Sequence, residues 1–119
     1  MAEYQPKFKP GREITLTASA AVTAGRLVEV TGNSTVAHAA AGSTRVVGVA
    51  MFDAAQGELV AVQSLGVHRL VAAGTIAPGA QVAAGANGTA ATTADGSGRV
   101  GIAIAGAADG AVALIKLDS

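Results

Sequence analysis

The feature that most constrains the fold is an internal repeat at a nearly constant offset. Residues 22–28 (VTAGRLV) correspond to residues 76–82 (IAPGAQV), and the correspondence continues down the chain. Later pairs include Asn33/Asn87, Thr35/Thr89, Gly42/Gly96, Ser43/Ser97, Arg45/Arg99 and, after a slip of one residue, Gly48/Gly101, Ala50/Ala103 and Gly57/Gly110. Shared richness in Ala and Gly can produce part of this similarity, but the Asn, Ser and Arg matches are not explained by composition. We therefore predict two similar β-meanders, residues 22–64 and 76–117, related by an approximate twofold axis.

Short apolar runs separated by turn residues predict an all-β fold. Residues 13–17 (EITLT) alternate between polar and apolar side chains, which is the period of a half-buried strand. Further strands are predicted at 26–30, 45–52, 58–63, 67–71, 99–105 and 111–117. Turn sequences such as Pro78-Gly79 and Asp109-Gly110 separate them, and the second of these favours a hairpin. The Ala-rich stretch 37–41 is too short for a stable helix and is expected to form single turns.

The composition predicts one small domain with a thin aliphatic core. Only three of the 119 residues are aromatic, 16 are glycine and none is cysteine. The core must then consist of Val, Ile, Leu and Ala, without disulfide support. We predict that residues 13–119 form a single small β-barrel or sandwich, with the strand at 67–71 bridging the two repeats.

Residues 1–12 (MAEYQPKFKPGR) differ from the rest and are predicted to form an extended N-terminal arm. Pro6 and Pro10 fix the backbone angle φ and remove amide donors, which disfavours a helix or a central strand. The segment has a net charge of +2, from three basic residues against Glu3, whereas the remainder has a net charge of −2. Two of the three aromatic residues, Tyr4 and Phe8, lie here, and aromatic anchors beside cations are typical of recognition segments. The alternative is a tail that folds back over its own core.

No catalytic, metal or cofactor site is predicted. His38 and His68 are the only histidines, and neither has acidic partners at ligand spacing. His68 is expected to point outward from its strand. Residues 95–98 (DGSG) lack the further carboxylates of a calcium loop and the Lys of a phosphate loop, so they indicate a turn. No nucleophile elbow or carboxylate pair is present.

Charge and hydropathy exclude other classes of partner. The formal net charge is zero, which is not the signature of a nucleic-acid-binding protein. No apolar run approaches membrane-spanning length, and the first residues lack the apolar stretch of a secretory signal. We expect a protein made in a cytoplasm and then assembled into something larger, with no membrane, nucleic acid or small-molecule partner.

Five segments stand out by their order and spacing. They are residues 8–18 (FKPGREITLTA), 20–25 (AAVTAG), 46–50 (VVGVA), 100–104 (VGIAI) and 111–117 (AVALIKL). Together they resemble the family of phage capsid cement proteins. Like this chain, members of the family have an aromatic–x–Pro–Gly arm, an Ile-Thr-Leu-Thr-Ala strand and a closing β-hairpin. The resemblance implies a non-enzymatic virion protein that binds the outer surface of a phage head and stabilises it by bridging major capsid protein subunits. It also implies synthesis in the cytoplasm of the host bacterium and assembly around threefold positions.

The arm is then the predicted capsid-binding element, and the protein is predicted to be a homotrimer, at least on the capsid. The residues that we expect to contact the capsid are Tyr4, Pro6, Lys7, Phe8, Lys9, Pro10 and Arg12. Two other interpretations remain open: another virion part, such as a head fibre or tail-tube protein, and a biotinyl- or lipoyl-like carrier domain. A carrier needs a modified lysine at a hairpin tip, whereas Lys116, the only lysine outside the arm, lies in an apolar strand.

Overall fold

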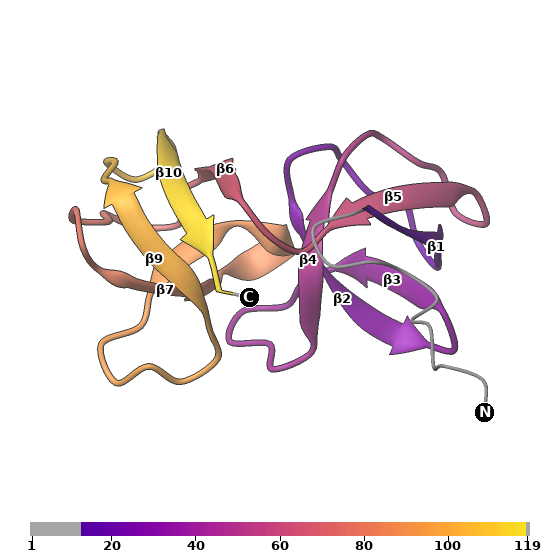
Figure 1. Cartoon of the computed structure of the whole chain (residues 1–119), viewed down its shortest axis with the longest axis horizontal. Helices are drawn as coiled ribbons and strands as arrows, with labels where there is room; N and C mark the ends of the chain where they lie inside the picture. Colours follow the sequence, from indigo (N-terminus) through magenta and orange to yellow (C-terminus); the bar gives the residue numbers. More distant parts are fainter. Residues whose placement is uncertain (1–12, 119) are drawn as a thin grey trace, which may run out of the picture.

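Two five-stranded β units lie side by side in the structure, a computed structural model that describes residues 13–118 (Figure 1). The N-terminal unit contains β1 (Ile14–Ala18), β2 (Leu27–Gly32), β3 (Thr35–His38), β4 (Val46–Ala50) and β5 (Leu59–Gln63). The C-terminal unit contains β6 (Val67–Val71), β7 (Gln81–Ala84), β8 (Ala90–Thr92), β9 (Arg99–Ala105) and β10 (Val112–Leu117), with a 3₁₀ turn (η1, Ala86–Gly88) before β8. The predicted all-β fold class is confirmed.

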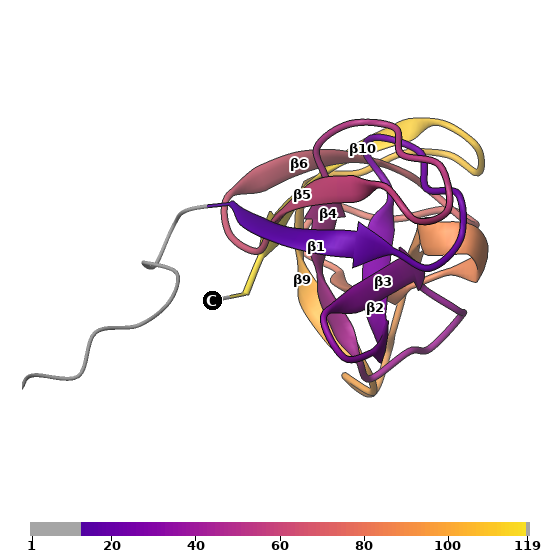
Figure 2. The same cartoon turned by 90° about the vertical axis from the view of Figure 1, so that its right-hand side faces the viewer.

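The N-terminal unit is a closed barrel with the strand order β1-β3-β2-β4-β5. β1 closes it by pairing antiparallel with β5, where Ile14 lies opposite Val62, and parallel with β3. Figure 2 shows this unit facing the viewer, with β1 and β5 side by side. Alternation along β5 places Val60 and Val62 in the barrel core and leaves Leu59 exposed. The barrel is filled by small aliphatic side chains, as the scarcity of aromatics requires.

The C-terminal unit repeats this topology in the order β6-β10-β9-β7-β8. Its seam is closed by a single parallel bridge between Ala72 and Ala90, which lie 54 positions after the Ala18 and Val36 that pair in the first unit. The prediction of two similar β-meanders is confirmed. Each unit begins one strand earlier than the repeat suggested, so the strand at 67–71 does not bridge the units. It pairs with β10 as the first strand of the second sheet.

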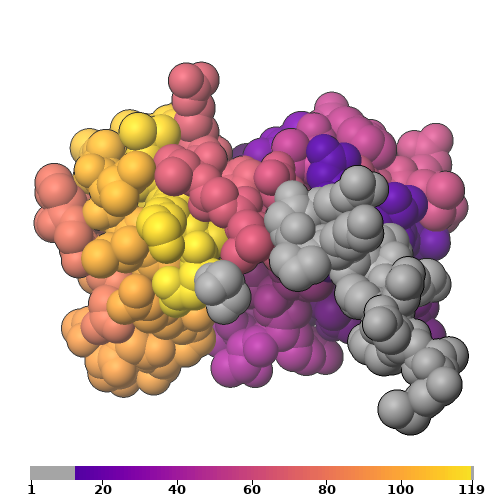
Figure 3. Space-filling model, viewed as in Figure 1, coloured from indigo at the N-terminus to yellow at the C-terminus, as the bar shows by residue number. Residues whose placement is uncertain are grey.

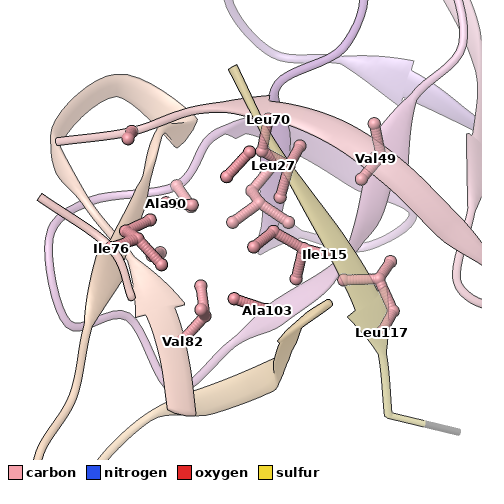
Figure 4. Packing of buried hydrophobic residues seen from close by; sticks show 13 residues of the cluster. Leu27, Val49, Leu70, Ile76, Val82, Ala90, Ala103, Ile115 and Leu117 are labelled. Carbon is pink, nitrogen blue, oxygen red and sulfur yellow. The ribbon is translucent and has the colours of Figure 1, made fainter. Parts of the chain in front are cut away.

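The buried apolar contact between the two units involves non-equivalent residues. Leu27 and Val49 project from the outside of the N-terminal barrel and share a buried cluster with Leu70 and Ile115 of the C-terminal unit (Figure 4). The position equivalent to Leu27 in the second unit is Gln81, which instead accepts a hydrogen bond from the guanidinium of Arg99. A twofold axis would place equivalent residues on both sides of the contact. The contact made by Leu27 is therefore not repeated at Gln81, because only one of these two equivalent positions is apolar.

The connection between β3 and β4 carries the backbone contacts between the units. The amide of Gly88 donates to the carbonyl of Ala39 at 2.9 Å, and the amide of Gly42 donates to the carbonyl of Ala84 at 2.9 Å. Glu29 is the buried charged residue of the described chain, and its side chain stabilises this loop through hydrogen bonds. Its carboxylate accepts hydrogen bonds from the Ala40 amide at 2.8 Å and from the guanidinium of Arg45 at 3.2 Å.

Replacing Glu29 by Gln is expected to lower the free energy of unfolding at pH 7 by about 1.5–3 kcal/mol, the scale of a hydrogen bond to a charged group. The amide of Ala40, with help from Arg45, holds the pKa of Glu29 below its usual value of 4.5. The carboxylate therefore stabilises the fold fully above pH 4.5, and this contribution disappears as the pH falls through the folded pKa. Urea unfolding at pH 7 and pH 3 measures both effects. Glu13→Gln, at an exposed carboxylate, is the control; a deficit that persists unchanged at pH 3 would contradict the prediction.

Candidate functional site

The predicted capsid-binding residues of the arm, Tyr4 to Arg12, lie outside the described residues. The structure does show where the chain enters the body. Glu13 precedes β1, whose first residue, Ile14, pairs with Val62 near the end of β5. β5 leads directly to β6, so the body begins close to the connection between the two units.

The two histidines have structural contacts. The ring of His38 accepts a hydrogen bond from the amide of Thr23 at 2.8 Å, and desolvation lowers the pKa of this ring. The ring of His68 donates to the carbonyl of Leu65 at 2.9 Å. His68 shares the face of the buried Leu70, so the expectation that it points outward is wrong. The residues on either side of it, Val67 and Arg69, are the exposed ones. Both faces of this strand carry aliphatic side chains, so alternation alone did not indicate which face is buried.

Most of the carboxylates of the body accept hydrogen bonds from backbone amides, either within their own turn or from a loop far away in the chain. Asp53 accepts from the amide of Ala24 at 2.7 Å, and Asp109 accepts from the amide of Gly74 at 2.8 Å. Asp95 closes its own turn by accepting from the Ser97 amide, which lowers the pKa of Asp95. Between residues 13 and 118, no group of three or more His, Cys, Asp or Glu side chains is arranged to hold a metal ion. These carboxylates fix loop geometry.

Lys116 lies within β10 and not at a hairpin tip, so the structure gives no support to a carrier domain. Within the same described range, no helix has the length and apolarity needed to cross a membrane.

Exposed side chains on the second sheet form a mixed apolar and basic surface. β6 and β10 place Val71 beside Val112, Arg69 beside Leu114, and Val67 beside Lys116 on one face. Val67 and Val112 are more than half exposed. Neither Arg69 nor Lys116 forms an ion pair with a residue in the described range. Part of this unit, with β10 in yellow, is visible in Figure 3.

Two grooves mark the junction of the units. The first has a floor of Val46 and Val100, and its wall is formed by the ion pair between Arg99 and Asp118, whose N–O distance is 2.9 Å. The second has a volume of about 370 Å³ and lies between the end of β4 and the start of β6. Sequence patterns did not reveal either groove, because each exists only where residues far apart in the chain meet. The one available signal was the alternation of β6, which does not say which face is outward.

Comparisons with known proteins point to a phage structural protein. A family model described as phage cement protein matches residues 8–117. Among solved structures, the head fiber gp8.5 N base of bacteriophage phi29 is 28% identical, with a TM-score of 0.74, and the match covers 89% of this chain and 92% of that chain. No curated protein matches the chain significantly. Because the family model spans nearly all of the sequence, including part of the arm, the chain belongs to the phage cement protein family.

Proposed function

We propose that this protein decorates the outer surface of a phage head and stabilises it by bridging neighbouring subunits of the major capsid protein. The observation that carries the proposal is the family match over residues 8–117, which includes both β units and the end of the arm. The described surface supports it, since carboxylates such as Asp53 and Asp109 hold loops in place and the exposed features are apolar and basic patches suited to protein contacts. The protein is made in the host cytoplasm and acts without catalysis.

The physical basis of such stabilisation is preferential binding to the closed shell. A protein that bridges two capsid subunits binds fully only when both subunits are in place. Its binding free energy is therefore added to the stability of the assembled head. We propose that three copies associate around a local threefold position, where several modest contacts act together. The arm is the main capsid-binding element of this proposal: Tyr4 and Phe8 fill pockets, while its basic residues pair with capsid carboxylates.

Imaging of heads assembled with and without the protein tests the proposal. We expect density for two adjacent β units outside the shell, in contact with two capsid subunits and repeated three times around a local axis. Decorated heads should also survive heating or osmotic shock that opens undecorated heads. Density inside the shell, or on one subunit only, would overturn the bridging role.

A second candidate function is the base of a head fibre. It is favoured by the likeness to the phi29 head fiber N base, which spans 89% of the chain at a TM-score of 0.74. The same images separate the two functions, because a fibre base carries a long projection beyond the two β units and a cement protein does not.

A further inference from the structure

The groove between β4 and β6 is built by residues of both units. Its walls include Met51 from the N-terminal unit and Val67 and Arg69 from the C-terminal unit, with Gly25 at one side. Because Gly25 has no side chain, the groove stays open beside β6. Met51 and Val67 are 38% and 52% exposed, so apolar surface flanks the opening on both sides.

β6 presents an unpaired backbone edge to this groove. The amide of Ala72 donates to Ala111 at 2.8 Å, which shows that even-numbered residues of β6 bond to β10. In an antiparallel pair the alternate residues face away, so the N–H and C=O groups of Val67 and Arg69 point to the other side. A methyl group on Gly25 would lie 3.9 Å from the carbonyl oxygen of Arg69, which places that carbonyl at the groove. Within residues 13–118 these groups have no backbone partner.

The charge of the groove determines the kind of segment that fits. Arg69 is exposed and forms no ion pair with a described residue, and no carboxylate lines the groove. Asp53, two residues beyond Met51, already accepts the amide of Ala24. The arm of a second copy is a poor match, because its net charge of +2 would face Arg69. An extended segment with carboxylates and small apolar side chains matches both the cation and the free edge.

We propose that this groove binds an extended acidic segment of the major capsid protein, which adds as a strand to the free edge of β6. The inference rests on the proposed function and supplies a second contact, separate from the arm. Backbone hydrogen bonds to Val67 and Arg69 provide affinity. The Arg69 guanidinium pairs with a carboxylate of the segment, and Met51 contacts its apolar side chains.

Two pairs of variants test the groove in the full-length chain, using purified heads assembled without this protein. Val67→Pro removes the groove-facing amide without touching the bonds to β10, whereas Val67→Ala keeps that amide. We expect the proline variant to bind about fivefold more weakly than the alanine variant, the loss for one hydrogen bond. Arg69→Glu should weaken binding at least about tenfold, and Arg69→Lys much less.

Co-sedimentation titrations measure the affinity, and thermal unfolding shows that each variant is folded. If Val67→Pro does not fold, the exposed Arg69 pair still decides the matter. Equal binding of wild type, Arg69→Glu and Val67→Pro would overturn the groove proposal and leave the decoration function intact. Failure of the wild-type protein itself to bind heads would overturn both.

Discussion

Replacing Gly101 by alanine is expected to lower the free energy of unfolding by about 3 kcal/mol. Gly101 lies in β9, where it is buried opposite Leu117 of β10 and Val82 of β7. An added Cβ would overlap the backbone carbonyl of Lys116 in β10. Because this contact is with backbone, no side chain can rotate away, and relief requires the two strands to separate. Urea unfolding monitored by far-ultraviolet circular dichroism measures the loss.

Gly110→Ala is the matched control. Gly110 has a φ of +81° in the turn before β10, and an added Cβ would meet nothing within 4 Å. Only the left-handed backbone is penalised there, at a cost of about 1 kcal/mol. Gly48, the counterpart of Gly101 in the first unit, should behave like Gly101, since its Cβ would overlap the carbonyl of Gln63. Equal losses for Gly101→Ala and Gly110→Ala would show that the strand spacing does not limit side-chain size.

Deleting residues 2–12 is expected to abolish most head decoration while leaving the β body folded. The body has its own closed barrel and its own buried clusters within residues 13–118, so its far-ultraviolet spectrum should not change. Loss of the aromatic anchors and three cations should weaken binding to heads by more than tenfold, since a single buried anchor contributes about 2 kcal/mol. Co-sedimentation with heads assembled without the protein measures the occupancy.

A point variant separates anchoring by an aromatic ring from attraction by charge. Phe8→Ala should weaken binding by about 2 kcal/mol if the ring fills a capsid pocket. Leu59→Ala, at an exposed aliphatic residue of the body, is the control. An arm that acts by charge alone would instead lose affinity steeply as salt rises and tolerate Phe8→Ala. Full occupancy by the truncated protein would show that the arm is dispensable and that the body holds the site.

Strands with strong local patterns were predicted well. Residues 67–71 and 99–105 are strands with the predicted bounds, because β-branched residues and flanking turns mark them clearly. β3, β7 and β8 were not predicted, since all three are short and the last two are rich in alanine, which has little preference for strands. Their conformation comes from pairing: in β7, for example, Gln81 lies opposite Ile102 of β9. Likewise, His68 was assigned to the wrong face because alternation gives two faces and does not say which is buried.

By itself, the sequence determined the repeat, the turn positions and the concentration of positive charge and aromatic residues in the first twelve positions. These depend on backbone angles and neighbour spacing, which are local properties. The tertiary structure alone decided how the units meet. Leu27 is fully buried against the second unit, whereas its counterpart Gln81 is only partly buried and accepts a hydrogen bond from Arg99. The groove beside β6 forms where the two units pack against each other. That packing depends on apolar surface contributed by residues far apart in the chain, so no short stretch of sequence reveals it.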